Sequence, residues 1–213
     1  MSFGAAHRLN AILAESGLPV LDEALSARFA EYFTLLIKWN GKINLTSIRD
    51  EDSILRRHFV ESIACARALP HGIGTLLDFG SGGGFPGIPI ALCRPEIAVT
   101  LAESQRKKAS FLREAVRTLR ISANVYADRA ELLAGRFDCV VLRAVDRMDS
   151  AVGAAARLLA PAGIVALMTI GTDIERLKAK TGTGFSWSEP ISLPLAENRV
   201  LALGSRVDTV GTV

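Results

Sequence analysis

Apolar positions in the first seventy residues recur at three- and four-residue spacings, which is the periodicity of amphipathic helices. Asp22 precedes the longest such stretch and has the side chain of a helix N-cap, while Gly41 follows it, where a helix commonly ends. We therefore expect a helical N-terminal part over residues 1–72, with a second break at Pro70–Gly74. The apolar positions that carry the pattern are Leu9, Ile12, Leu13, Leu25, Phe29, Tyr32, Phe33, Leu36 and Ile37.

From Thr75 onward the pattern changes to short apolar runs that alternate with amphipathic stretches. Strands separated by helices predict βαβ units, a mostly parallel sheet and right-handed crossovers, and so an α/β fold. The clearest helix is expected at Gln105–Leu119, and the segment that ends at Arg199–Leu203 is expected to add antiparallel strands at one sheet edge. The expected parallel strands are Thr75–Phe79, Ala98–Ala102, Asn124–Tyr126, Phe137–Leu142 and Ile164–Thr169.

Length and composition fit one sizeable core. The chain has 213 residues, 49% of them hydrophobic, and no linker or repeat divides it. We expect a single domain over residues 1–213, in which the helical extension of residues 1–72 packs on a core of residues 73–213. The net charge of +3 only mildly favours an acidic partner such as RNA.

Cysteine usage and the N-terminal segment bear on the compartment. Cys65, Cys93 and Cys139 lie far apart in apolar segments, which argues against disulfides or a zinc site and predicts core residues in a reducing environment. The segment Met1–Asn10 lacks an export signal, and no apolar run approaches the roughly 18 residues of a membrane span. We expect a cytoplasmic protein with no metal and no membrane partner, and we take it to act as a monomer.

The most informative segment is a glycine-rich loop, in which an apolar strand leads into five glycines within eight residues. Glycines permit positive φ and remove the Cβ atoms that would keep a ligand away from the strand ends. Pro86 stands where the next helix can begin, because proline is tolerated in a first turn. The loop therefore predicts a site for a nucleotide-like molecule. The glycines expected to contact this ligand are Gly80, Gly82 and Gly84.

Three acidic residues bear on which nucleotide binds, because the glycine spacing alone also fits the dinucleotide fingerprint of NAD enzymes. Asp78, at the strand end before the loop, favours S-adenosylmethionine, since a carboxylate would attract a cationic amino-acid group and repel a pyrophosphate. Glu103 ends the next strand and suits both ribose hydroxyls, and Asp128 follows the third strand and suits the adenine amino group. Each also has an ordinary alternative: a turn cap for Asp78, a helix N-terminal charge for Glu103 and an N-cap for Asp128.

Several segments are far more specific than a generic glycine loop. They are Trp39-Asn40 with Asn44-Leu45-Thr46, Arg57-His58 with Glu61-Ser62, the Gly84-Phe85-Pro86-Gly87 ending of the loop, and Phe137-Asp138 leading to Arg143-Ala144. Through these segments nearly the whole chain resembles the bacterial glucose-inhibited-division-B family, the methyltransferases that modify guanine N7 in small-subunit ribosomal RNA. The resemblance implies a Rossmann-like class I S-adenosylmethionine-dependent methyltransferase fold, with a mostly parallel seven-stranded sheet.

The resemblance also implies an S-adenosylmethionine cofactor and a small-subunit ribosomal RNA, or a ribosomal subunit, as partner. It leaves open whether Trp39, Asn40 and Asn44 build the substrate pocket or hold the extension against the sheet. Two departures stand out: Glu61 occupies a position where the family commonly has Asp, and Met168–Gly171 replaces a segment that usually carries a Lys before its Gly. The implied cofactor contacts are Gly80, Phe85, Ala130, Glu131 and Arg143.

Methyl transfer to guanine N7 needs no general base, because the nitrogen lone pair lies in the ring plane and carries no proton. The enzyme then acts mainly by orientation and by fixed dipoles. Arg143 closes an apolar strand at the sheet edge, where it can pair with the cofactor or a carboxylate, or donate to guanine O6. Its structural alternative is an ion pair with Asp146 or Glu131. His58 is expected to position groups rather than to take a proton.

Basic residues supply candidate RNA contacts, with the target base expected to be unstacked into the pocket. Arg56 and Arg57 beside His58 are one set, and the helix Gln105–Leu119 carries another that also fits a solvated helix face. Two other functions stay open: an NAD-dependent oxidoreductase, and a non-catalytic RNA-binding module that keeps a relict cofactor fold, which the intact loop disfavours. The basic residues of or just after that helix are Arg106, Lys107, Lys108, Arg113, Arg117 and Arg120.

Overall fold

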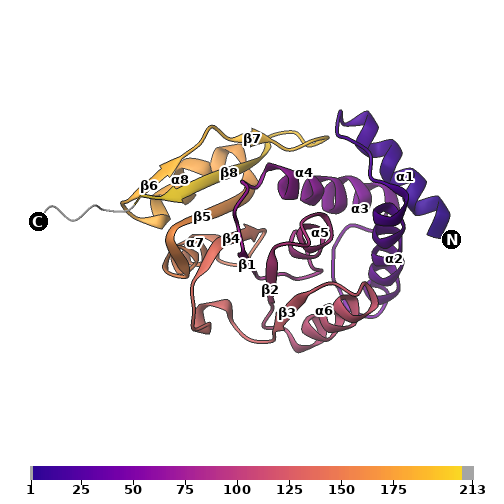
Figure 1. Ribbon diagram of the computed structural model, residues 1–213, viewed down its shortest axis with the longest axis horizontal. Coiled ribbons are helices and arrows are strands. Elements are labelled where there is room, and N and C mark those ends of the chain that lie inside the picture. The colour runs from indigo at the N-terminus through magenta and orange to yellow at the C-terminus, as the bar shows by residue number, and fades with distance from the viewer. Residues whose placement is uncertain (1, 208–213) are drawn as a thin grey trace, which may run out of the picture.

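The computed structural model describes residues 2–207, which form one mixed sheet with helices on both faces (Figure 1). The strand order is β3-β2-β1-β4-β5-β8-β6, and β7 pairs with β8. Strands β1 to β5 pair in parallel, whereas β8 pairs antiparallel with β5, β6 and β7. The strands are β1 (Thr75–Phe79), β2 (Ala98–Ala102), β3 (Ala123–Tyr126), β4 (Phe137–Arg143), β5 (Leu159–Ile170), β6 (Phe185–Trp187), β7 (Ile191–Ser192) and β8 (Arg199–Arg206).

The expected strands and the antiparallel edge are confirmed, with one difference in number. The sheet has eight strands, because the two-residue β7 adds to the expected seven. Strand β5 also begins earlier than Ile164, since Leu159 pairs with Phe137 before a register shift in the ladder. The expected domain further included residues 1 and 208–213, which lie outside the described residues.

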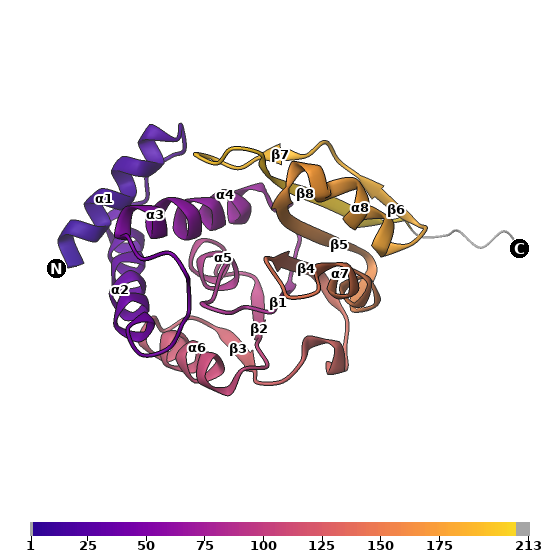
Figure 2. The ribbon, with the colours of Figure 1, turned by 180° about the vertical axis from the view of Figure 1, so that it is seen from behind.

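The helices divide between the two faces of the sheet, as the view from behind shows (Figure 2). Helices α1 to α6 cover one face, and α7 and α8 cover the other. In the described range no helix is both long and apolar enough to cross a bilayer. The helices are α1 (Ser2–Glu15), α2 (Glu23–Asn40), α3 (Glu51–Ile54), the π-helix η1 (Leu55–Val60), α4 (Glu61–Ala68), α5 (Gly87–Cys93), α6 (Arg106–Thr118), η2 (Ala130–Leu132), α7 (Met148–Arg157), η3 (Gly171–Asp173), α8 (Ile174–Lys178) and η4 (Ala179–Thr181).

The N-terminal helices pack directly on the sheet layer. The side chain of Asp22 caps α2 by accepting from the Leu25 N–H at 2.7 Å, as the sequence predicts. The buried Tyr32 hydroxyl donates to the carbonyl of Gly83 in the glycine loop at 2.5 Å. Trp39 packs edge to face on Phe111 of α6, with ring centroids 5.8 Å apart. The extension is therefore held to the loop and to α6, and Trp39 serves this packing.

Side chains of successive strand residues enter two apolar layers, because they point to opposite faces of a sheet. In β1, Leu76 joins the layer under α1–α6, while Leu77 joins the layer under α7 and α8. Cys65 and Cys139 are buried and Cys93 is half-buried, all without disulfides, so the prediction of core cysteines is confirmed.

The parallel strands all end at one edge of the sheet. Phe79, the last residue of β1, lies opposite Ala102 of β2 and Leu142 of β4, and Ala102 lies opposite Tyr126 of β3. Strand β8 runs antiparallel, so its first residue, Arg199, lies at this edge, opposite Ile170. Residues that are distant in the chain therefore meet there, and this edge carries the candidate site.

Candidate functional site

A pocket of about 690 Å³ lies at this edge, within the range of small-molecule sites. Its walls come from the segments that follow β1, β2, β3 and β4, from residues 45–48 and from η1. It brings together residues that are far apart in the sequence. The expected site residues that line it are His58, Gly80, Gly82, Phe85, Glu103, Asp128, Ala130, Glu131 and Arg143.

The glycine loop folds over the end of β2. The amides of Gly80 and Ser81 both donate to the carbonyl of Ala102, at 3.0 and 2.9 Å, which anchors the loop to the neighbouring strand. Gly80 and Gly82 have positive φ and line the pocket. Gly84 does not line it: a Cβ there would lie 2.5 Å from the Ile88 side chain. The structure therefore places Gly84 away from the pocket lining and against α5, and its contact with a ligand stays a prediction.

Asp78 is likewise not at the pocket surface. Its buried carboxylate lies behind the loop and accepts from the Gly87 N–H at 3.1 Å. Burial raises the pKa of Asp78 to about 7, against the opposing effect of its hydrogen bonds and of Arg143. The side chain of Asp78 thus points toward the start of α5 and fixes the loop, and a direct contact with the ligand stays a prediction.

Glu103 occupies the position expected of a ribose-binding acid. Its two carboxylate oxygens accept from the amides of Gly82, at 3.0 Å, and Gln105, at 2.7 Å. A carboxylate has about four acceptor positions, so further acceptor capacity remains for a ligand. Asp128 is exposed at the pocket and accepts from the adjacent Arg129 N–H at 2.7 Å. Its alternative role as an N-cap is wrong, because Arg129 occupies the N-cap position of η2.

The opposite part of the pocket carries three arginines arranged around Glu61, which we call the arginine cluster: Arg57, Arg143 and Arg199. Glu61 is fully buried. Its carboxylate accepts from Arg199 at 2.9 and 2.7 Å and from Arg143 at 3.1 Å, and Arg57 approaches to 3.8 Å. One carboxylate thus holds three guanidinium groups at the pocket wall.

Arg143 therefore does form an ion pair, but its partner differs from both expected candidates. Within the described chain it pairs with Glu61, whereas Asp146 and Glu131 line the pocket without pairing with it. Burial lowers the pKa of Arg143 to about 10, with Glu61 opposing this effect. Arg143 also donates to the carbonyl of Arg57 in the π-helix η1, a type of segment that recurs at functional sites.

His58 is held as a neutral side chain. Its Nε2 shares a hydrogen bond with the Thr46 hydroxyl at 2.7 Å, and its ring stacks on Phe85 with centroids 4.9 Å apart. Burial, together with the charges of the arginine cluster, lowers the pKa of His58 to about 3. Such an imidazole does not accept a proton near neutral pH. By contrast, Arg56 pairs with Glu15 on the surface and does not line the pocket, and its contact with RNA stays a prediction.

Asn40 supports the wall formed by residues 45–48. Its side-chain oxygen accepts from the amides of Leu45 and Thr46, at 3.0 Å each, so Asn40 fixes this segment rather than lining the pocket itself. The sequence did not single out Arg199 as a site residue. A signal was available, because the first residue of an antiparallel strand lies where its parallel neighbours end.

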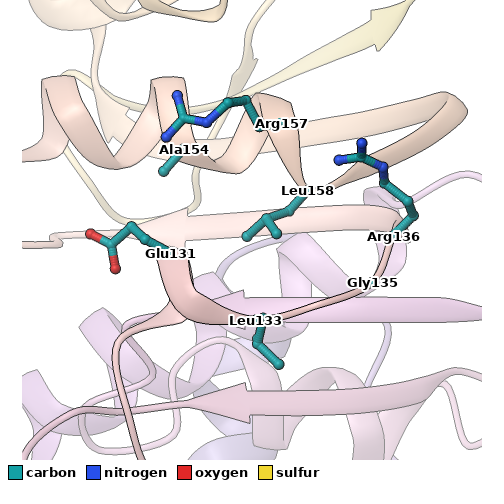
Figure 3. Close-up of a pocket in the computed structure, with 7 residues that line it drawn as sticks. All are labelled: Glu131, Leu133, Gly135, Arg136, Ala154, Arg157 and Leu158. Carbon is teal, nitrogen blue, oxygen red and sulfur yellow. The ribbon is translucent and has the colours of Figure 1, made fainter.

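A second, smaller cavity of about 340 Å³ lies between α7 and the segment that precedes β4 (Figure 3). Its charged residues are Glu131, Arg136 and Arg157, and Figure 3 shows the Glu131 carboxylate and the Arg136 guanidinium well apart. It contains neither the glycine loop nor Glu103. The polar residues that converge on one site therefore lie in the larger pocket and not in this smaller cavity.

Solved structures with this architecture define the class of fold. The mitomycin 7-O-methyltransferase aligns with a TM-score of 0.60 and 14% identity, over 97% of this chain and 68% of that chain. A predicted O-methyltransferase from Agrobacterium tumefaciens aligns with a TM-score of 0.58 and 16% identity, over 70% of this chain and 81% of that chain. The chain thus has the Rossmann-like methyltransferase fold, as expected.

The sequence comparisons identify the family. A family model described as rRNA small subunit methyltransferase G matches residues 25–194. The ribosomal RNA small subunit methyltransferase G of Stenotrophomonas maltophilia (strain K279a) is 44% identical over 151 residues, 70% of each chain. That of Aromatoleum aromaticum is 46% identical over 160 residues, 71% of this chain and 74% of the relative. The chain belongs to this family, which confirms the resemblance; the oxidoreductase and the relict binding module have no support.

Proposed function

We propose that this protein transfers a methyl group from S-adenosylmethionine to N7 of a guanine in small-subunit ribosomal RNA. The observation that carries the proposal is the division of one pocket into two parts. Glu103 follows β2, and the glycine loop follows β1. The arginine cluster lies around the end of β4 and the start of β8. One part suits a cofactor with a ribose, and the other suits a nucleotide rich in hydrogen-bond acceptors.

The residues of the first part fit the cofactor. Gly80 and Gly82 line the pocket without a Cβ, and Glu103 is oriented by two backbone amides with acceptor capacity left for hydroxyl groups. When bound, the cofactor supplies a methyl group on a positively charged sulfur. Asp78 and Gly84 act indirectly, by shaping the loop. The residues we infer to contact the cofactor are Gly80, Gly82, Phe85, Glu103, Asp128, Ala130, Glu131 and Arg143.

The second part fits an acceptor that carries no proton. Guanine N7 offers its lone pair directly, so the neutral His58, with its pKa of about 3, need only orient its neighbours. Arg143 uses one guanidinium nitrogen for Glu61 and for the carbonyl of Arg57, which leaves its other N–H groups for a ligand. Arginine is suited to donate to guanine O6 and to phosphate oxygens. Positioning is therefore the main contribution of these side chains.

The test combines binding and transfer. Purified protein is titrated calorimetrically with S-adenosylhomocysteine and separately with NAD, and methyl-label transfer is then measured on small ribosomal subunits that lack the modification. We expect binding of S-adenosylhomocysteine only, and label recovered as 7-methylguanine. Binding of NAD instead would overturn the cofactor, and cofactor binding with label in another base would overturn the acceptor.

A matched pair of variants tests the placement of the site. Gly82→Asp adds a carboxylate at the pocket beside Glu103, so it should abolish binding of S-adenosylhomocysteine. Gly17→Asp is the control, because Gly17 also has positive φ and open space around its Cβ position but does not line the pocket. Normal affinity in Gly82→Asp, with both variants folded, would show that the ligand binds elsewhere.

A further inference from the structure

A separate groove of about 460 Å³ adjoins the main pocket, and we call it the lysine groove. It lies beside the start of the loop that follows α2 and beside the first turn of α6. Gln105 and Lys108 line both the lysine groove and the main pocket, so the two hollows lie side by side. The residues that line the groove are Asn40, Gly41, Lys42, Ile43, Asn44, Gln105, Lys107 and Lys108.

The lysine groove carries uncompensated positive charge. Lys42, Lys107 and Lys108 line it, and no acidic residue does. Across residues 2–207 none of these lysines forms an ion pair, whereas Arg8, Arg56 and other surface cations do. Three like charges around one hollow repel one another, and a bound anion would relieve that repulsion.

The position of two of these lysines is also unfavourable for the helix itself. The first turn of α6 contains basic residues, Lys107 and Lys108 among them, and no acidic residue. The positive end of the helix dipole disfavours cations there, so this arrangement costs helix stability instead of adding to it. The basic face of the helix near the pocket is therefore not explained by the helix alone.

The uncharged groups of the groove are further donors. The side-chain oxygen of Asn44 accepts from Arg49 at 3.0 Å, which leaves its amide N–H groups as donors. The side-chain oxygen of Asn40 is likewise occupied by the amides of Leu45 and Thr46. Ammonium and amide donors without an acid match the oxygens of a phosphate group, which only accept hydrogen bonds.

We propose that the lysine groove binds a backbone phosphate of the RNA strand that carries the target nucleotide. The inference rests on the proposed function, which places that nucleotide in the main pocket, and the shared lining by Gln105 and Lys108 puts the groove next to it. The phosphate contact holds the strand while the base enters the main pocket. The groove contributes positioning, because a phosphate contact carries no base information.

The test compares two double variants that remove the same charge. Lys42→Ala/Lys107→Ala removes two positive charges from the groove. It leaves Lys108 unchanged, because Lys108 also lines the main pocket. Arg113→Ala/Arg117→Ala removes two charges from exposed positions of α6 that line neither hollow. Both variants change exposed side chains and should fold. The probe is small-subunit ribosomal RNA transcribed in vitro, and equilibrium binding is measured at several salt concentrations.

We expect the lysine variant to bind RNA about tenfold more weakly, and the slope of log K against log [salt] to fall by about 0.7 in magnitude, the value for one phosphate contact on a single strand. The arginine variant should keep the wild-type slope. The affinity for S-adenosylhomocysteine should stay the same in both. In transfer assays the lysine variant should show a raised KM for RNA with kcat retained.

Two results would overturn the groove assignment. The first is an equal salt slope for the two double variants. The second is a lysine variant that binds the naked transcript normally and fails only on assembled subunits, which would indicate that the groove contacts a protein. The proposed function has its own readout. If the wild-type protein binds the transcript through the groove but yields no 7-methylguanine on any substrate, the groove assignment stands and the proposed reaction fails.

Discussion

Glu61 organises the arginine cluster, so replacing it by Gln should damage both stability and transfer. The substitution removes the charge that faces Arg57, Arg143 and Arg199 and places an amide against their donors. Glu61 is fully buried, and the side chain of Arg143 is only 6% exposed. Solvent therefore offers little compensation once the carboxylate is lost.

The expected loss follows from this burial. Removing one partner of a buried ion pair costs about 3–5 kcal/mol, because a buried charge is left uncompensated. For a chain of this size each kcal/mol lowers Tm by roughly 2–4 °C, so Glu61→Gln should melt about 10 °C below the wild type. Glu61→Asp retains the charge and should fall between the two.

The control is Glu15→Gln, which makes the same change in the exposed pair of Glu15 with Arg56. Exposed pairs contribute little to stability because solvent screens them, so this variant should melt close to the wild type. Urea unfolding and thermal melts measure both variants. Equal stability of Glu61→Gln and Glu15→Gln would refute the reasoning about the buried cluster.

Catalysis gives a second readout on the same variant. Displacement of Arg143 and Arg199 should lower kcat about 100-fold, because small misplacements of positioning groups are costly. The affinity for S-adenosylhomocysteine should also fall, because Arg143 is one of the residues inferred to contact the cofactor, but by less than kcat, since Glu103 and the glycine loop form no hydrogen bond with Glu61. A Glu61→Gln variant that is folded at the assay temperature and has wild-type kcat would show that the cluster has no part in orienting the acceptor.

Three further outcomes follow from single residues. Gly84→Ala should destabilise the protein by about 2 kcal/mol or more in urea unfolding, because its Cβ would lie 2.5 Å from the Ile88 side chain. The pKa of Asp78 rises from 3.8 to about 7 on folding, so wild-type stability should decline by on the order of 4 kcal/mol as pH rises through this window, and Asp78→Asn should flatten the decline. The pKa of His58 falls from 6.5 to about 3, so its contribution is present above pH 6.5 and lost on acidification; His58→Gln should reduce the acid-side loss of stability measured in urea titrations.

Each of these outcomes has a clear contrary result. Gly82→Ala is the control for Gly84→Ala, because the nearest atom to its Cβ position lies at 3.9 Å, and equal losses would refute the packing argument. Unchanged pH profiles in Asp78→Asn or His58→Gln would show that the group titrates alike in the folded and unfolded chain.

The local pattern of the sequence determined the elements and part of the site. Strand and helix periods are set by neighbouring residues, so the five parallel strands, the cap of α2 and the glycine loop were predictable. Parallel strands end at a common edge, which is why Glu103 and Arg143 were correctly brought to one pocket.

Only the tertiary structure decided where individual side chains point and which distant residues meet. Asp78 precedes the predicted loop and Gly84 lies in it, yet both pack against α5 and not at the pocket, because the close approach of α5 determines which side of the loop faces the pocket. Glu61 and Arg199 are 138 residues apart, and they meet because β8 runs antiparallel to β5, which brings its first residue to the end of the sheet where the parallel strands finish. Periodicity describes neighbours along a chain, whereas pairing across this distance depends on the packing of the whole sheet and its helices.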